Sequence, residues 1–281
     1  MENSNKPLCI MSDFHSVYQA IWKVQDKIDE GYRVAILGDC IDRGAFGYKM
    51  LLQIYEEYQS GSNLIFIPGN HEAEMYSTLY YVYKRYEKIL NKRELENGNR
   101  AFTEEDRQSI YDEILEIFEK VSADEDERGS TNGSSHTYFG IVYDIETYKG
   151  AAEKFIEVMD WLGSQPLLRI ETDIDGKKIA LCHASFDMGL YEDFGGQFSL
   201  ETRLALKEKM KSNSKERNFY ESYYERARTC LWYRTDLEKR LVPVRLPTEE
   251  EADQIVIGHV SQPNNEIEVK TLKGIRKRKR I

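Results

Sequence analysis

The chain has 281 residues, and 39 Lys and Arg against 49 Asp and Glu give it a formal net charge of −10. Hydrophobic residues at 41% and aromatic residues at 12% supply a core and exclude wholesale disorder. The acidic balance argues against a general nucleic-acid-binding surface, because phosphate backbones are held by clustered cations. No stretch approaches the roughly 20 consecutive apolar residues of a membrane span. The start of the chain is too polar for a signal peptide, so we expect a cytoplasmic protein with no membrane partner.

Five short apolar runs predict buried strands, and each stops at a polar cluster that contains His, Asp or Asn. The runs cover residues 7–11, 34–37, 64–67, 179–182 and 255–257. Amphipathic helical patterns at 17–30 and 47–59 separate the first three runs. Alternating strands and helices predict an α/β sheet, in which polar residues at the strand ends meet in one crevice. The five runs therefore predict one site.

The middle of the chain differs in character. Residues 72–120 have a helical pattern rich in Tyr and Glu, and residues 123–135 have the composition of a linker. We therefore expect a helical insertion over about 73–150 that contains a mobile loop.

Further elements follow the insertion. Helical patterns cover 150–162 and 200–231, and between them Asp175-Gly176 supplies the turn of a hairpin. A last apolar run at 267–272 ends the predicted domain, residues 1–272. Six cations crowd the remaining tail, 273–281, for which a solvated terminus is preferred and contact with nucleic acid is the alternative.

Four of the five histidines stand just after the apolar runs, a placement that chance would not produce. They are His15, His71, His183 and His259. Asp13 lies two residues before His15, so at an extended strand end both side chains project to the same side and can bind one ion. Asp39 follows the second run and Asn70 the third, and both add oxygen ligands. Mixed nitrogen and oxygen ligation favours Mn, Fe or Zn over Ca.

Five blocks, in their order along the chain, resemble those of the calcineurin-like metallophosphoesterases. They are Asp13-Phe14-His15, Gly38-Asp39-Cys40-Ile41-Asp42-Arg43-Gly44, Gly69-Asn70-His71-Glu72, His183-Ala184 and Gly258-His259. The second and third blocks most resemble the phosphoprotein phosphatase branch, which includes bacterial Ser/Thr phosphatases and symmetrical diadenosine tetraphosphate hydrolases. Ser12 and Ser16 replace the glycines that usually flank the first block, and this departure removes no ligand. The resemblance implies an α/β fold, a four-layer αββα sandwich with a helical insertion.

The resemblance also implies a centre of two metal ions, with Mn favoured and Fe or Zn as alternatives. Asp13 and His15 are expected to hold the first ion, and Asn70, His183 and His259 the second. Asp39 is expected to bridge them. Two ions so placed convert a bridging water into hydroxide, which is the expected nucleophile for in-line attack on phosphorus.

The remaining polar residues of the blocks have catalytic roles by the same resemblance. His71 is expected to protonate the leaving group, while Asp42 orients it and raises its pKa. Arg43 and Asn70 are expected to bind phosphate oxygens. Arg234, in a Leu-Trp-Tyr-Arg segment similar to the L-W-x-R of the bacterial members, is the candidate for a second phosphate clamp. A surface charge beside a core tryptophan is its alternative role, and Arg226 and Arg228 lie nearby.

The predicted function is therefore that of a metal-dependent phosphohydrolase for phosphomonoesters, with a Ser/Thr-phosphorylated protein as the favoured substrate. A diadenosine-polyphosphate or nucleotide hydrolase is the alternative, because it needs the same metals and the same acid. The tyrosine-rich run at 76–86 either stacks a nucleobase or packs in the core. A non-catalytic partner-binding protein would have lost a ligand, His71 or Arg43, and none is missing. A nuclease is disfavoured by the acidic net charge of the chain. The sequence does not indicate the oligomeric state.

Overall fold

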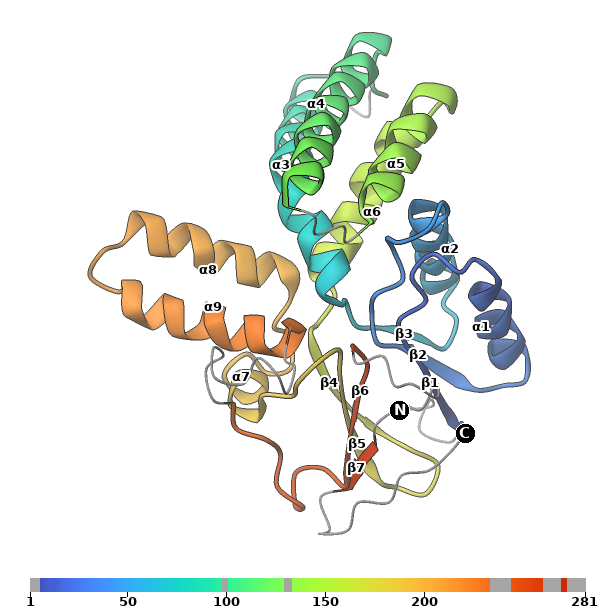
Figure 1. Cartoon of the computed structure of the whole chain (residues 1–281), viewed down its shortest axis with the longest axis vertical. Helices are drawn as coiled ribbons and strands as arrows, with labels where there is room; N and C mark the ends of the chain where they lie inside the picture. The colour runs from blue at the N-terminus through green and yellow to red at the C-terminus, as the bar shows by residue number, and fades with distance from the viewer. Residues whose placement is uncertain (1–5, 98–100, 129–132, 233–243, 260–268, 272–281) are drawn as a thin grey trace.

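The computed structural model describes residues 6–97, 101–128, 133–232, 244–259 and 269–271. Figure 1 shows the helices and strands, none of which in this part of the chain is both long and apolar enough to cross a membrane. In chain order they are β1 (Leu8–Met11), α1 (Gln19–Asp29), β2 (Arg33–Ile36), α2 (Gly47–Gln59), β3 (Leu64–Phe66), α3 (Asn70–Asn97), α4 (Glu104–Arg128), α5 (Ser135–Thr147), α6 (Ala151–Ser164), β4 (Leu168–Thr172), β5 (Lys178–Cys182), α7 (Met188–Asp193), α8 (Leu200–Ser212), α9 (Arg217–Trp232), β6 (Gln254–Ile257) and β7 (Val269–Thr271).

Within the described residues the strands form two sheets. Strands β1, β2 and β3 run parallel, because α1 and α2 carry the chain back between them. In the second sheet β4 and β5 form an antiparallel hairpin, β5 and β6 run parallel, and β6 and β7 are antiparallel. The hairpin turns at Gly176, whose φ of +77° lies in the region that glycine adopts without strain. All five apolar runs form strands, as predicted.

The two sheets share an apolar layer made of alternate strand residues. It consists of Ala35, Leu37, Ile65, Ile67, Ile179, Leu181 and Val256. The intervening residues, such as Ile36 and Cys182, belong to the larger core that the helices complete. Each of these strands therefore buries both faces, which explains why the runs are continuously apolar. The α/β class is confirmed, and the four-layer order stays a prediction.

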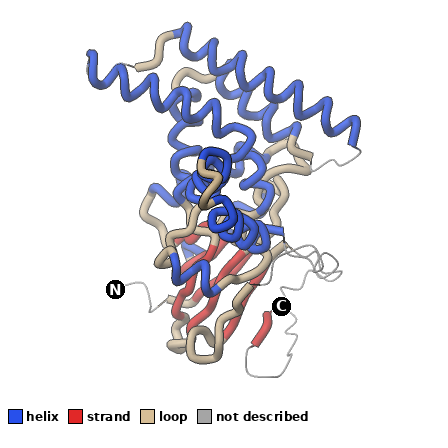
Figure 2. Tube along the Cα trace, turned by 90° about the vertical axis from the view of Figure 1, so that its left-hand side faces the viewer, coloured by secondary structure: helices blue, strands red, loops and turns tan. Residues whose placement is uncertain are grey.

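Helices α3 to α6 form a group that projects away from the strands (Figures 1 and 2). Helix α4 packs on α5, and α3 packs on α6. The expected linker at 123–135 is wrong for residues 123–128, which belong to α4, and α5 already begins at Ser135. Residues 129–132 of the expected linker lie outside the described part. Asp, Glu and Arg are compatible with an exposed helix, so a charged composition alone does not indicate a loop.

The helical region predicted at 200–231 is two helices, α8 and α9, which lie side by side (Figure 1). Strand β7 lies within the last predicted run. The tail at 273–281 falls outside the described residues.

Candidate metal centre

The predicted ligands converge because each follows a strand. His15 comes after β1, Asp39 after β2, His183 after β5 and His259 after β6, while Asn70 begins α3 after the three residues that follow β3. The first two loops are joined by a hydrogen bond in which the His15 N–H donates to the Asp39 carbonyl at 2.9 Å. Parallel strands end at the same edge of a sheet, so these side chains meet there.

The second predicted metal site is a cluster of four potential ligands around His183. Its Nε2 lies 3.0 Å from His259 Nδ1, 3.1 Å from Asn70 Oδ1 and 3.4 Å from Asp39 Oδ2. Its Nδ1 donates to the Leu37 carbonyl at 2.6 Å, so in the neutral ring Nε2 presents a lone pair. Nitrogen and oxygen atoms with lone pairs repel one another at this spacing, and a cation bound among them would remove the repulsion. The donor set therefore fits a transition-metal ion.

Asp39 also belongs to a second group, with His15 and His71. The Nε2 atoms of both histidines lie 3.9 Å from Asp39 Oδ2, and the ligand atoms of the three residues are within 4.8 Å of one another. His15 Nδ1 is held 3.3 Å from the Ile41 carbonyl, which directs Nε2 to the centre. Because Asp39 is common to both groups, it occupies the place that a bridging ligand requires.

Asp13 lies beside these groups. Its Oδ2 accepts hydrogen bonds from Ser12 Oγ at 2.5 Å and from the His259 N–H at 3.0 Å. Ser12 Oγ is also 3.0 Å from the carbonyl of Leu37, the residue before the second block, so the serine that replaces a glycine connects the two loops. Direct ligation by Asp13 stays a prediction, whereas its contact with the His259 backbone connects the first block to the last.

His71 lies between Asp42 and Arg43. Its Nδ1 is 2.7 Å from Asp42 Oδ2, and its Nε2 is 3.3 Å from Arg43 Nη2. His71 and Asp42 are buried, while Arg43 is exposed. Burial lowers the pKa of His71, but the Asp42 hydrogen bond and the Asp39 charge raise this pKa by more, so it lies above its usual value. The carboxylate thus holds the ring through Nδ1, and Nε2 faces the guanidinium of Arg43.

One carboxylate among several imidazoles sets the electrostatics of the centre. Burial raises the pKa of Asp39, but His183 and His71 lower it by more, so this pKa lies below its usual value. Burial lowers the pKa of His183, but the Asp39 carboxylate more than offsets this and raises it to about 9. For His15, burial dominates and lowers the pKa. Asp39 therefore remains ionised when buried, which is the form in which a carboxylate can bind a cation.

The backbone of the centre adopts left-handed conformations that L-residues rarely take. Among the described residues, the non-glycine positions with positive φ are Asp13, His15, Ser16, Asp39, Asp42, Arg43 and His259. All of them lie in or next to the five blocks. A Cβ at Gly69 would lie 2.2 Å from Asp39 Oδ1, so glycine is needed where the third block approaches the second. Strain of this kind is concentrated where side chains must face one centre.

The chain matches the family described as calcineurin-like phosphoesterase over residues 6–263, a range that includes all five blocks. The chain belongs to the calcineurin-like phosphoesterases. Comparisons with curated proteins and with solved structures returned no match. As a member of this family the enzyme is a metal-dependent phosphoester hydrolase, and its family binds two divalent metal ions, for which the Asp39-sharing groups supply ligands.

Glu72 is a residue of this phosphoesterase to which sequence reasoning assigned no role. It is fully buried, and its Oε2 accepts the N–H groups of Asp39 and Gly69, each at 2.8 Å. Its Oε1 accepts those of Cys40 at 2.7 Å and Ile41 at 3.3 Å. One carboxylate thus joins the two ligand loops. The available signal was its place directly after Asn-His, in the first turn of a helix.

Two hydroxyl groups hold Asp42 of the phosphoesterase. Thr137 Oγ1 donates to Asp42 Oδ1 at 2.7 Å and accepts the Asp42 N–H at 3.1 Å. Ser16 Oγ donates to the Asp42 carbonyl at 2.9 Å. Ser16 is the other serine that replaces a glycine. Thr137 lies in α5, 95 residues from Asp42, and no local pattern indicates the contact.

The candidate for a second phosphate clamp, Arg234, lies outside the described residues of the phosphoesterase. Of the two arginines near it, Arg226 makes two hydrogen bonds to the buried Asp187, at 2.7 and 2.8 Å. Arg228 is exposed and lies 3.4 Å from Glu225. Arg226 is therefore committed to a structural ion pair.

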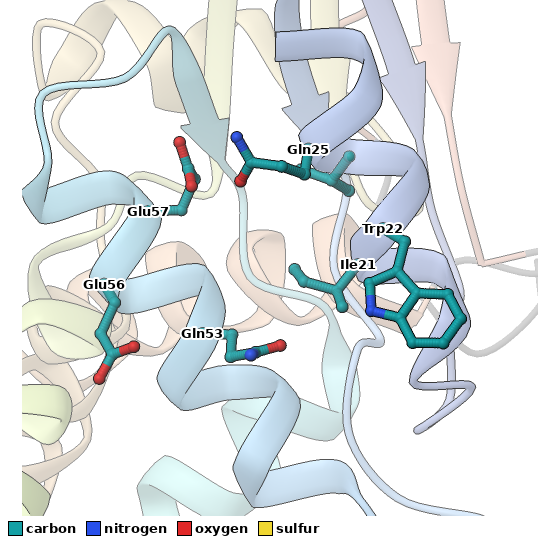
Figure 3. Close-up of a pocket in the computed structure, with 7 residues that line it drawn as sticks. Ile21, Trp22, Gln25, Gln53, Glu56 and Glu57 are labelled. Atoms are coloured by element: carbon teal, nitrogen blue, oxygen red, sulfur yellow. The ribbon is translucent and has the colours of Figure 1, made fainter. Parts of the chain in front are cut away.

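A hollow of about 370 Å³ lies between α1 and α2 of the phosphoesterase (Figure 3). Its lining is Ile21, Trp22, Val24, Gln25, Gln53, Glu56 and Glu57. None of these residues belongs to the five blocks. Its charged lining residues are carboxylates, which repel phosphate, so this hollow does not suit the reacting group.

Proposed function

We propose that this phosphoesterase hydrolyses phosphomonoesters and that its substrate is phosphoserine or phosphothreonine in proteins. The placement of His71 between Asp42 and Arg43, beside the Asp39-sharing groups, is the observation that carries the proposal. A departing alkoxide needs a proton, and phosphate oxygens need a cation. The imidazole and the guanidinium that supply them lie side by side.

The residues of the chain account for binding and proton transfer. The exposed Arg43 guanidinium binds two phosphate oxygens and offsets charge in the transition state. Asp42 holds the His71 ring by Nδ1, so that Nε2 gives its proton to the leaving oxygen. Metal ions held by the two Asp39-sharing groups would supply Lewis-acid chemistry, which would polarise the phosphate and lower the pKa of a bound water molecule.

The positions of the tyrosines support a protein substrate over a nucleotide. Tyr76, Tyr83 and Tyr86 are buried in the core, and the Tyr83 hydroxyl donates to Asp160 at 2.8 Å. Rings enclosed in this way do not offer a face to a nucleobase. Tyr81 is exposed on α3.

A groove of about 500 Å³ between α2 and α5 gives further support. Exposed aromatic rings in its lining belong to Phe46, Tyr143 and Tyr148. The groove begins at Ala45, two residues after Arg43 in the chain. Glu56 and Asp144 contribute two negative charges to it against one positive charge of Lys49. A dinucleotide polyphosphate would bring additional phosphates to these carboxylates, whereas a polypeptide with apolar and basic side chains would not.

Hydrolysis of para-nitrophenyl phosphate by metal-stripped protein, with Mn²⁺ added back, tests the proposed chemistry. We expect Mn²⁺-dependent turnover that falls at least about 100-fold in Asp39→Asn and in His71→Asn. Absence of turnover in protein that has bound two ions would contradict the proposal.

A competition assay then tests the substrate class. A Ser/Thr-phosphorylated peptide and diadenosine tetraphosphate are offered together, and we expect the larger kcat/KM for the peptide. Faster cleavage of the dinucleotide would overturn the protein phosphatase assignment and establish the nucleotide hydrolase instead.

A further inference from the structure

We propose that Thr137 of α5 is a positioning residue for catalysis: it fixes Asp42 and, through Asp42, the orientation of His71. The inference rests on the proposed function, because it concerns how His71 delivers its proton. It makes the helical group α3 to α6 a part of the active site.

Three buried side chains are joined by two consecutive hydrogen bonds. Thr137 Oγ1 is 2.7 Å from Asp42 Oδ1, and Asp42 Oδ2 is 2.7 Å from His71 Nδ1. Each carboxylate oxygen therefore has its own partner. The Thr137 hydroxyl also accepts the Asp42 N–H at 3.1 Å, so its single proton is directed to Oδ1. Two-point contact fixes both the backbone and the carboxylate plane of Asp42.

The loop that carries Asp42 needs support from outside. Asp42 and Arg43 have φ values of +68° and +62°, which cost free energy in L-residues. The Arg43 N–H donates to the Gly133 carbonyl at 3.1 Å, a contact that comes from the same segment as Thr137. Residues 133–137, just before and within the first turn of α5, thus hold both residues of the strained pair.

Glycines leave the space that this contact requires. A Cβ at Gly47 would lie 2.5 Å from Thr137 Oγ1, and a Cβ at Gly133 would lie 2.7 Å from the Arg43 backbone nitrogen. Both glycines allow α5 to approach the loop. Because Thr137 is fully buried, a substitution that removes its hydroxyl leaves Asp42 Oδ1 and the Asp42 N–H without this partner.

The test compares two aryl phosphates whose leaving groups differ in basicity. Para-nitrophenolate leaves without assistance, whereas phenolate from phenyl phosphate needs a proton, so a misplaced acid affects the second substrate more. The proteins are wild type, Thr137→Val, Thr137→Ser, the acid-free reference His71→Asn, and Thr147→Val, a matched change at the exposed end of α5. Mn²⁺ titration and thermal unfolding of each variant verify that it is folded and loaded.

We expect Thr137→Val to lose roughly tenfold more kcat on phenyl phosphate than on para-nitrophenyl phosphate, in the same direction as His71→Asn. Thr137→Ser should restore the wild-type ratio, and Thr147→Val should keep it. If valine prevents folding, Thr137→Ala is expected to show the same larger loss of kcat on phenyl phosphate. Equal losses on both substrates, or no loss, would overturn the inference. Absence of Mn²⁺-dependent turnover in the wild type would instead refute the proposed function.

Discussion

A single carboxylate oxygen, Asp39 Oδ2, faces both groups of metal-type side chains, and a second carboxylate, Glu72, holds the backbone on which Asp39 sits. Burial and the nearby Asp39 charge raise the pKa of Glu72, while the backbone N–H groups that it accepts act in the opposite direction. Glu72 thus fixes the geometry of the centre without contributing a ligand. Such supporting residues contribute to metal affinity through the positions of the ligands.

Glu72→Gln keeps the shape of this side chain but turns an NH₂ group towards two of the backbone N–H donors. We expect the free energy of unfolding to fall by about 3 kcal/mol, because buried donors lose their acceptor. Mn²⁺ affinity should fall by roughly 10- to 100-fold. Urea denaturation and calorimetric titration measure the two effects. Glu119→Gln, at an exposed position on α4, is the matched control, and a Glu72 variant equal to that control would refute this role.

Ser16 affects the stability of the fold in two opposite ways. Its φ of +62° favours glycine, while its hydroxyl donates to the Asp42 carbonyl. Ser16→Ala loses the hydrogen bond and keeps the strain, whereas Ser16→Gly loses the bond and relieves the strain. We therefore expect the glycine variant to be more stable than the alanine variant by about 1 kcal/mol in chemical denaturation. An alanine variant as stable as the glycine variant would show that the left-handed backbone carries no cost here.

At the scale of elements, α9 fixes the segment that carries His183. The Cys230 carbonyl, near the end of α9, accepts the Ala184 N–H at 3.0 Å and the Ser185 N–H at 3.3 Å. Arg226, one turn earlier, binds Asp187, which is fully buried at the start of α7. The fourth block therefore depends on a helix that lies about 40 residues later in the chain.

Arg226→Gln removes the partner of a buried charge. We expect the free energy of unfolding to fall by about 3 to 5 kcal/mol, since Asp187 is left uncompensated. Adding Asp187→Asn should recover at least about 1 kcal/mol relative to additive losses in a double-mutant cycle. Arg228→Gln, at an exposed position of the same helix, should change stability by less than about 1 kcal/mol. Strict additivity of the Arg226 and Asp187 changes would argue against the pair.

For the whole molecule, the sequence predicts elements whose apolar pattern is continuous. The five strand runs and the helix at 47–59 agree with the structure. Burial of both strand faces leaves a continuous apolar run, and burial of one helix face leaves apolar residues at helical spacing. Helix α5 was not singled out, since Gly133 and Ser134 precede it and Gly140 lies within it. Propensity is a weak guide where tertiary packing decides.

The candidate site likewise contains residues that the sequence predicts and residues that only tertiary packing brings together. The placement of His15, Asp39, Asn70, His183 and His259 together is foreseen, because each follows a strand and strand ends converge. Contacts made by Thr137 and Arg226 join segments far apart in the chain, so no local sequence pattern predicts them. The candidate ligands can therefore be predicted from the sequence, while the groups that hold them in place are found only in the fold.

Counting the metal ions tests the central claim, that two ion sites share Asp39, most directly. Metal-stripped protein is titrated calorimetrically with Mn²⁺. We predict two equivalents for the wild type, one for His15→Ala, which belongs to only one group, and none for Asp39→Asn at concentrations that saturate the wild type. His136→Ala, an exposed histidine on α5, should keep both. A wild type that binds a single ion, or an Asp39→Asn variant that still binds two, would contradict the account.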